Sequence, residues 1–196
     1  MTVATVVVQQ FSGAGPDKDT VTTPRLSTMD DDAPGTANPI PIAAAGITFS
    51  YWMTLHLTIT NIQDATVLNN HLFYSDGTCG WALGGAGDLF IAQKTGDDMG
   101  VPVASYDQAG GSVGETGYDM NDVTNGHDFY KTGVGTHSAP VAVDSLTTGG
   151  SEMTVDDDDH TIAEGFQGIV IQAEVDDDAT RGAQVAETLT FVYDEV

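Results

Sequence analysis

Residues 47–61 read ITFSYWMTLHLTITN and decide the fold class of this chain. Apolar side chains occupy every second position from Ile47 to Ile59, and the positions between them are mostly Ser, Thr and His. A period of two with β-branched and aromatic residues is typical of a half-buried β-strand and excludes a helix. At ~3.3 Å per residue the run is more than twice the usual strand length of ~17–20 Å. We therefore expect it to bend between two sheets or to break into two strands.

Similar runs predict further strands along the chain. They cover residues 2–9, 66–75, 88–94, 139–146, 166–175 and 184–193, with weaker candidates at 101–106 and 127–132. Turn pairs such as Asp76–Gly77 separate them, and no helical period persists for ten residues. This pattern predicts an all-β, antiparallel β-sandwich or jelly-roll-like single domain over residues 1–196.

Residues 12–46 differ in composition from the predicted strands. They are rich in Pro, Gly, Thr and Asp and include the segment NPIPI at residues 38–42. Proline removes backbone donors, so this stretch is predicted to be a long extended N-terminal arm or loop rather than sheet interior. Ile40 and Ile42 have no obvious partner on the same sheet, and we expect them to contact a neighbouring subunit.

The charge balance excludes two classes of partner. Twenty-nine acidic residues stand against five basic ones, for a formal net charge of −24. Nucleic acids and anionic membranes are bound through cations, so neither is an expected partner. With 40% hydrophobic residues the chain is expected to fold, and in molar salt, where the Debye length is ~3 Å, its carboxylates are screened. A halophilic protein is favoured, and an acidic protein of a low-salt organism is the alternative.

The sequence also bears on the compartment. Cys79 is the only cysteine, so no intrachain disulfide can form. The first residues lack the basic and apolar regions of a signal peptide, and no run approaches the ~20 apolar residues of a membrane span. We expect synthesis and assembly in the cytoplasm.

No residue pattern predicts catalysis. Residues 110–114 match G-x-S-x-G, but the strand and helix that would hold Ser112 as a nucleophile are missing from the flanks, which favours a flexible loop. The five histidines lack metal-ligand spacing, and His56, on the polar parity of the central run, is expected at the surface or an interface. We predict no catalytic residue, no metal site and no cofactor.

Three acidic runs, at residues 30–32, 156–159 and 176–178, supply oxygen ligands that hard cations prefer. None has the register of an EF-hand loop, so a solvated surface is favoured over a structural Ca²⁺, Mg²⁺ or Na⁺ ion. Paired carboxylates for glycoside hydrolysis would need one raised pKa in an apolar cleft, which a sequence does not show.

The two tryptophans are candidates for contacts. Trp52 lies on the otherwise polar face of the central run, where it either covers a second core layer or anchors a partner. Trp81 lies in the glycine-rich stretch 80–87 and is predicted to be an interface or loop anchor. The interface candidates are therefore Trp52, Trp81, Ile40 and Ile42.

Three segments carry a family resemblance. They are residues 39–61, 71–77 and 169–196, with the motifs SYW at 50–52, FYSDG at 73–77 and ETLTFVYDE at 187–195. Together they resemble proteins encoded among the structural genes of tailed viruses and proviruses. The resemblance implies a virion component, and the acidic composition points to a haloarchaeal tailed virus.

These observations define the expected function. The resemblance implies a non-enzymatic virion structural protein, assembled in the host cytoplasm and attached to the capsid or head–tail region as a decoration, turret or neck/tail connector subunit. Its partners would be capsid, portal or tail proteins and further copies of itself. The alternative is a cell-surface or carbohydrate-binding β-sandwich of a halophile, with Trp52, Trp81 and Tyr106 stacking on sugars.

Overall fold

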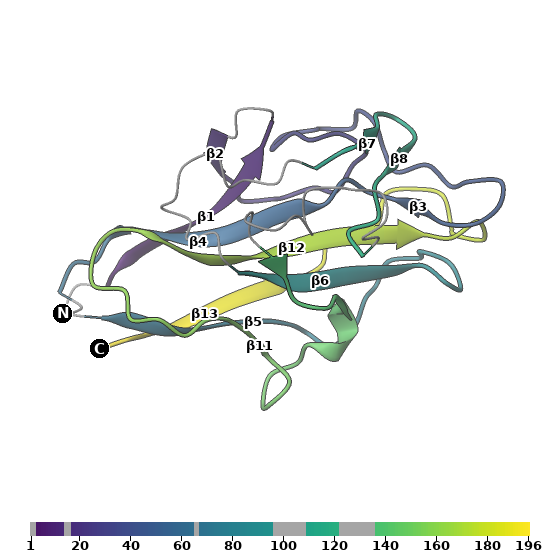
Figure 1. Cartoon of the computed structure of the whole chain (residues 1–196). Helices are drawn as coiled ribbons and strands as arrows, with labels where there is room; N and C mark the ends of the chain where they lie inside the picture. Colours follow the sequence, from purple (N-terminus) through teal and green to yellow (C-terminus); the bar gives the residue numbers. More distant parts are fainter. Residues whose placement is uncertain (1–2, 14–16, 65–66, 96–108, 122–135) are drawn as a thin grey trace.

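The computed structural model describes residues 3–13, 17–64, 67–95, 109–121 and 136–196 (Figure 1). The described chain is nearly all β, and its two larger sheets, both antiparallel, face each other. A single 3-10 turn, η3 (Val143–Ser145), is the one named helical element in these ranges. The predicted all-β, antiparallel single domain is confirmed.

The large sheet has the strand order β10-β6-β12-β4-β1-β2, and β3 also pairs with β12 while β9 pairs with β6. Its strands are β1 (Thr5–Ser12), β2 (Asp17–Thr20), β3 (Thr48–Phe49), β4 (Met53–Asn61), β6 (Asp88–Thr95), β9 (Thr136–His137), β10 (Val141–Ala142) and β12 (Gly165–Val175). Strand β12 lies between β4 and β6, with Ile171 opposite both Met53 and Ile91. It is buried along nearly its whole length, as expected of a central strand.

The small sheet has the order β11-β5-β13, from β11 (Met153–Asp156), β5 (Leu68–Ser75) and β13 (Leu189–Glu195). Asn70 has a φ of 51°, next to a shift in the register between Val192 and Asp194. Such a bulge changes which side chains face the core, and His71 is buried directly after it. A separate hairpin is formed by β7 (Gly111–Ser112) and β8 (Thr116–Gly117).

The main core lies between the two sheets. Its buried members are Met53, Leu55, Phe73, Leu83, Leu89, Ile91, Val143, Leu146, Val155, Ile169, Ile171, Ala173 and Val175. Leu57 and Ile59 continue the same face of β4 into an adjoining cluster with Phe166. Each fully buried apolar side chain contributes ~1.5–3 kcal/mol, so the inward-facing residues of β4 supply a large part of the free energy that holds the sheets together.

The central run breaks in two, as one of the sequence expectations required. Ser50 N–H donates to the carbonyl of Ala173 in β12 at 2.9 Å, whereas Tyr51 N–H donates to the carbonyl of Ser27 at 2.8 Å. The backbone therefore changes partner between these residues. Strand β3 ends at Phe49 and β4 begins at Met53.

The polar parity of the central run is buried too, which makes the surface prediction for His56 wrong. His56 is 0% exposed and its ring stacks on Phe11 at 5.0 Å between centroids. Trp52, at 3% exposure, belongs to a second cluster on the outer face of the large sheet with Val170 and Met120. Of the two alternatives for Trp52, the second core layer is therefore the one observed.

Residues 17–46 fold back onto the sandwich of the same chain. The first four form β2 against β1, and Ile40 and Ile42 pack against the main core. Both isoleucines therefore have apolar partners within their own subunit, and their expected contact with a neighbouring subunit stays a prediction. Thr28 N–H donates to the carbonyl of Asn38 at 2.9 Å, so the loop closes on itself before it rejoins the sheet.

Two further strand predictions were partly wrong, and five short strands were missed. Residues 139–146 contain only the short β10 and the turn η3. The last strand begins at Leu189 rather than at residue 184. The strands that were not predicted are β2, β11 and the two-residue strands β7, β8 and β9. The weaker candidates at 101–106 and 127–132 lie outside the described residues.

Candidate functional site

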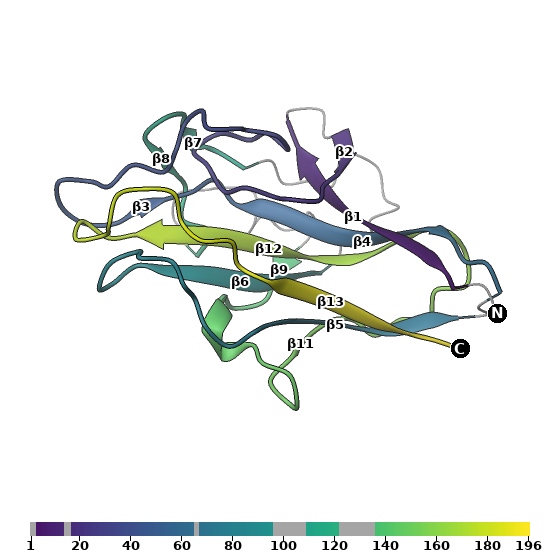
Figure 2. The ribbon, with the colours of Figure 1, turned by 180° about the vertical axis from the view of Figure 1, so that it is seen from behind.

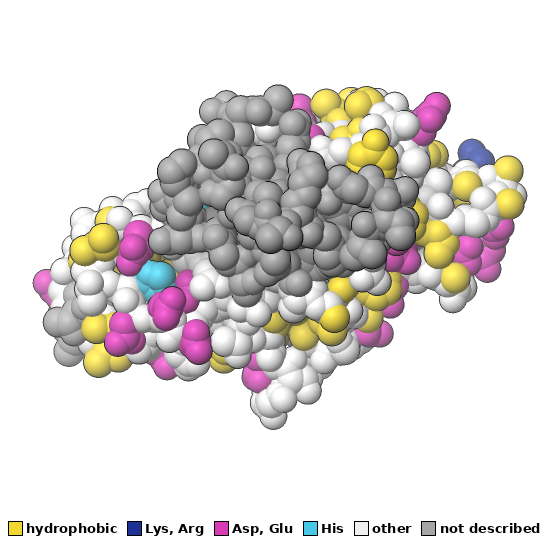
Figure 3. All heavy atoms as spheres, in the orientation of Figure 1, with side chains coloured by type: hydrophobic (Ala, Val, Ile, Leu, Met, Phe, Trp, Pro, Cys, Tyr) yellow, Lys and Arg dark blue, Asp and Glu magenta, His cyan; other side chains and the backbone are white. Residues whose placement is uncertain are grey.

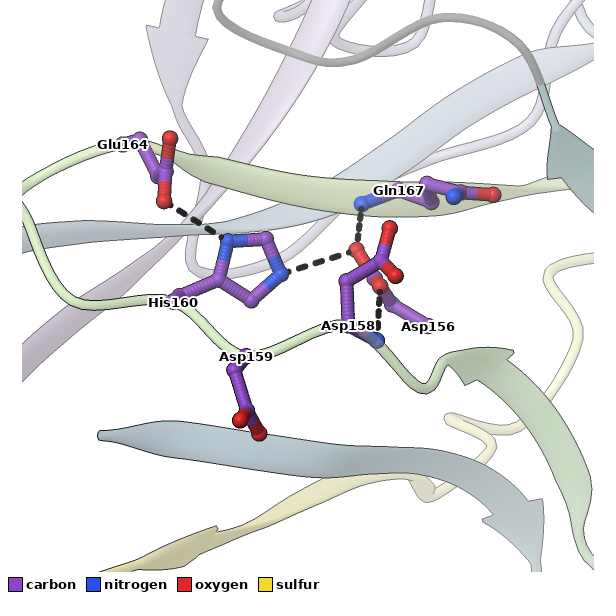
Figure 4. Close-up of a pocket in the computed structure, with 6 residues that line it drawn as sticks. All are labelled: Asp156, Asp158, Asp159, His160, Glu164 and Gln167. Carbon is purple, nitrogen blue, oxygen red and sulfur yellow. Dashed lines mark hydrogen bonds and ion pairs between the residues drawn. The ribbon is translucent and has the colours of Figure 1, made fainter.

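A polar hollow lies at the end of the sandwich that carries both termini, where β11 turns into β12 (Figures 1 and 4). It is lined by Asp156, Asp158, Asp159, His160, Glu164 and Gln167. Figure 3 shows acidic side chains gathered around a histidine at this end of the molecule. The hollow is the natural candidate for a functional site because titratable groups converge on it.

The backbone positions the lining residues through a tight loop. Strand β11 ends at Asp156, whose Oδ1 accepts the N–H of Asp158 at 3.0 Å and starts the turn. His160 then pairs with Leu68 of β5 through two backbone hydrogen bonds of 2.9 Å each. Glu164 directly precedes β12, so the loop is held at both ends by strands.

The side chains form a carboxylate–imidazole–carboxylate row (Figure 4). His160 Nε2 lies 3.1 Å from Asp156 Oδ2, and His160 Nδ1 lies 2.9 Å from Glu164 Oε1. Asp156 Oδ2 also accepts the backbone N–H of Gln167 at 2.8 Å. Both oxygens of Asp156 are therefore hydrogen-bonded, as a carboxylate that is only 3% exposed requires.

This geometry shifts both pKa values toward the charged forms. Hydrogen bonding to Asp156 raises the pKa of His160 to about 9, against burial and with the help of Glu164. Burial alone would raise the pKa of Asp156, but the hydrogen bonds from His160, Gln167 and Asp158 and the imidazolium charge lower it overall. At neutral pH the row is an imidazolium held between carboxylates.

A second histidine lies beside the row in the opposite charge state. His71 pairs with Asp156 in the β11–β5 register, is 0% exposed, and contacts Phe166 and Phe191 at 4.6 and 5.3 Å between centroids. Neither of its ring nitrogens has a hydrogen-bond partner. Burial lowers the pKa of His71 to about 4, with Asp156 acting upward and His160 downward. His71 is therefore neutral at pH 7.

The row is poorly suited to acid–base or nucleophilic catalysis. A general base needs a free nitrogen and a pKa near the working pH, and both nitrogens of His160 are taken by carboxylates. None of the lining residues carries a hydroxyl or thiol. Nor does any group of three or more His, Cys, Asp or Glu in the described ranges have a geometry that could hold a metal ion. The arrangement is that of an ion-paired clamp between β11, β12 and β5.

A second pair of carboxylates lies elsewhere in the large sheet. Glu174 of β12 is directly opposite Asp88 of β6. Burial raises the pKa of Glu174 to about 7, with further contributions from Asp119 and Asp88, and burial also raises the pKa of Asp88. Like charges that face each other across a ladder destabilise the sheet, so this pair carries a cost at neutral pH.

Other residues singled out from the sequence lie apart from the hollow. Ser112 is exposed in the β7–β8 hairpin, which continues as strand rather than helix, so it does not sit on a nucleophile elbow. Trp81 is half-buried, and its Nε1–H donates to the carbonyl of Val185 at 2.7 Å. Tyr106 lies outside the described residues.

The acidic runs are largely at the surface, as expected: Asp157, Asp158, Asp159, Asp177 and Asp178 are exposed. Asp178 Oδ1 accepts the N–H of Gly85 at 2.8 Å, and Asp176 Oδ2 accepts that of Ala86 at 2.9 Å, so this run fastens the glycine-rich loop. Asp156 is buried in the clamp, which corrects its assignment to a solvated surface. The sequence analysis did not predict the clamp, because the spacing D-x₃-H-x₃-E inside an acidic run matches no known catalytic or metal-binding motif. The β-bridge between His160 and Leu68 helps to bring its members together.

No protein-family model, no curated protein and no solved structure matches this chain. No helix in the described ranges is both long enough and apolar enough to cross a membrane.

Proposed function

We propose that this chain is a non-enzymatic structural subunit of the virion of a halophilic tailed virus. The observation that carries the proposal is the closed state of the polar cluster at the end of the sandwich, in which His160 is fixed between Asp156 and Glu164. A site built for acid–base chemistry leaves a reactive atom free, whereas here both ring nitrogens of His160 are bonded to carboxylates. Such a clamp suits a protein whose task is to keep its shape.

The residues behind the family resemblance also have structural tasks. Ser75 in the FYSDG motif is buried, donates from Oγ to the carbonyl of Val143 at 2.7 Å, and accepts the N–H of Gly77 at 3.0 Å. The SYW motif lies at the break between β3 and β4, and the closing motif contains β13. A resemblance carried by turns and strands supports a shared architecture and leaves the position in a particle to experiment.

The charge of the chain supports a halophilic setting. A formal charge of −24 on 196 residues is costly in dilute buffer and screened in molar salt. We place the subunit on the capsid or at the head–tail region, as a decoration, turret or connector, with capsid, portal or tail proteins as partners. It would be assembled in the host cytoplasm.

Mass spectrometry of purified virus particles tests this function. We expect peptides of the chain in stoichiometric amounts relative to the major capsid protein, and they should remain after high-salt washing of the particles. Their absence from particles, when the same lysate contains the protein, would overturn the proposal.

The alternative, a carbohydrate-binding β-sandwich, has weaker support. Trp52 is buried in the second core layer, and Trp81 is half-buried with its Nε1–H already bonded to Val185. Stacking on a sugar requires an exposed aromatic face. Specific binding on a glycan array in molar salt, lost in Trp81→Ala, would favour this alternative over the virion role.

A further inference from the structure

The edges of the two sheets are protected unequally. An unpaired edge strand invites pairing with another chain, and proteins prevent this with charges or with very short strands. The large sheet ends in β2, with the sequence DKDT, and on the other side in the two-residue strands β9 and β10. In the small sheet, β11 has four residues and ends in Asp156. These four strands are blunted.

Strand β13 is the exception among the described edges. It has seven residues, of which the first five, LTFVY at 189–193, carry no charge and include neither Pro nor Gly. Within the described residues only β5 pairs with it, and Figure 2 shows it crossing the near side of the molecule. Its free edge is long, apolar and unguarded.

The side of the core next to β13 is also incompletely covered. Leu189, Phe191 and Tyr193 pack against the buried clusters, yet each remains partly exposed. Val6 and Val8 of β1, in the facing sheet, are likewise only partly buried. A strand added beside β13 would therefore gain backbone hydrogen bonds and would cover apolar side chains that the single chain leaves in water.

We propose that a second copy of this chain binds here, with the two β13 strands paired antiparallel across a two-fold axis at Phe191. A two-fold axis through a strand edge produces antiparallel pairing. It would place Phe191 opposite its own copy, Thr190 opposite Val192, and Leu189 opposite Tyr193. These are the aromatic and β-branched pairs that stabilise antiparallel sheets.

Across residues 188–194 this register places no acidic residue opposite another. Thr188 would face Asp194, a hydroxyl opposite a carboxylate. Glu187 and Glu195 would be the first acidic residues to face each other, and each is held within its own subunit: Glu187 Oε1 accepts the N–H of Gly80 at 2.6 Å, and Glu195 Oε1 accepts that of Ala4 at 3.0 Å. Two copies with a charge of −24 each still repel over long distances, so the dimer is expected in molar salt and not in dilute buffer.

This interface is independent of any position in a virion, so either proposal can fail alone. The first experiment measures the mass of the full chain by light scattering after gel filtration in 3 M NaCl. We expect a dimer that dissociates on dilution, with β13 amides protected from hydrogen exchange at high protein concentration and not at low. A monomer at all concentrations, or unchanged exchange in β13, would overturn the proposal without the need for a variant.

Charge substitutions test the register. Thr190→Lys combined with Val192→Lys would place two like charges opposite each other on both sides of the axis, and dimerisation should weaken at least tenfold. Thr190→Glu combined with Val192→Lys places opposite charges there and should restore it. Thr154→Lys, at an exposed position on the β11 edge, is the matched control and should leave the dimer intact.

The outcomes separate cleanly once circular dichroism has confirmed that each variant is folded. A dimer that survives the double lysine substitution would place the interface elsewhere. Loss of the dimer in both double variants would exclude pairing about Phe191. The expected result is that the control variant and the Glu/Lys variant form dimers and that the double lysine variant does not. Dissociation of the control variant would refute the assignment of the interface to β13.

Discussion

His71 provides the sharpest test of the electrostatics described above, through the substitution His71→Leu. In the folded protein its pKa is lowered to about 4, whereas in the unfolded chain it returns to about 6.5. Between pH 6.5 and pH 4 the unfolded state therefore binds a proton that the folded state does not bind, and the free energy of unfolding decreases as the pH falls toward 4. Leucine removes this linkage because it does not titrate.

The magnitude follows from the pKa difference. One pKa unit corresponds to ~1.4 kcal/mol, so between pH 7 and pH 5 the wild type should lose ~2 kcal/mol of stability that the variant keeps. The comparison is a difference of differences, so the titration of groups that do not interact with His71, such as Glu174, cancels. Any change in packing caused by leucine also cancels, because packing does not depend on pH.

Urea unfolding in 3 M NaCl at pH 5, 6 and 7 measures this quantity. The free energy of unfolding of His71→Leu relative to wild type should rise by ~2 kcal/mol from pH 7 to pH 5. Phe73→Leu, a buried core substitution on the same strand, is the control and should show the same deficit at all three pH values. A pH-independent difference for His71→Leu would mean that the buried imidazole is not held neutral, and the reasoning would fail.

Three other predictions follow from the same structure. His160→Gln should destabilise the protein by ~1–3 kcal/mol at pH 7, because the raised pKa of His160 makes its contribution to stability complete below pH 6.5 and lost as the pH rises through about 9. Urea unfolding should show a smaller loss of stability at pH 10 than at pH 7, and an equal loss at both values would contradict the ion pair. Glu174→Gln should stabilise the protein by ~1 kcal/mol at pH 8, a value discounted for partial exposure, and by less at pH 5. The reason is that wild-type stability falls as the pH rises from 4.5 through the raised pKa of about 7. Equal effects in urea unfolding at both pH values would argue against that raised pKa. The melting temperature of the wild type should fall between molar and millimolar NaCl, since the Debye length grows to ~30 Å at 0.01 M; an unchanged value would remove the physical support for a halophilic host.

The sequence by itself determined the fold class and most of the core. The alternation in residues 47–61 predicted one apolar face from Ile47 to Ile59, and its members in β4, namely Met53, Leu55, Leu57 and Ile59, are all buried. Before the break the prediction fails, since Ile47 is exposed, Phe49 is half-buried and Tyr51 lies in the outer cluster with Trp52. Alternation is a local property, set by the geometry of a single strand, so it can be read without knowledge of the partners. The expected break in that run was equally local, because its length exceeded what one strand can use.

What lies against the outer face of that strand was decided only by tertiary structure. His56 and Trp52 sit among Ser and Thr, a pattern that is the same whether the face meets water or another part of the chain. The capture of Ile40 and Ile42 by the main core likewise depends on contacts between segments distant in sequence. Hydrophobicity indicates that such residues will be covered, but not by what.

The charged clamp illustrates the same limit. Asp156, His160 and Glu164 are spaced by four, yet they lie on a strand end and a loop, where spacing fixes no direction. Their row forms because the Asn70 bulge, the bridge between His160 and Leu68, and the start of β12 converge at one end of the sandwich. Burial there suppresses the charge of His71 and hydrogen bonding preserves that of His160, so two identical side chains take opposite states for reasons that only the folded environment supplies.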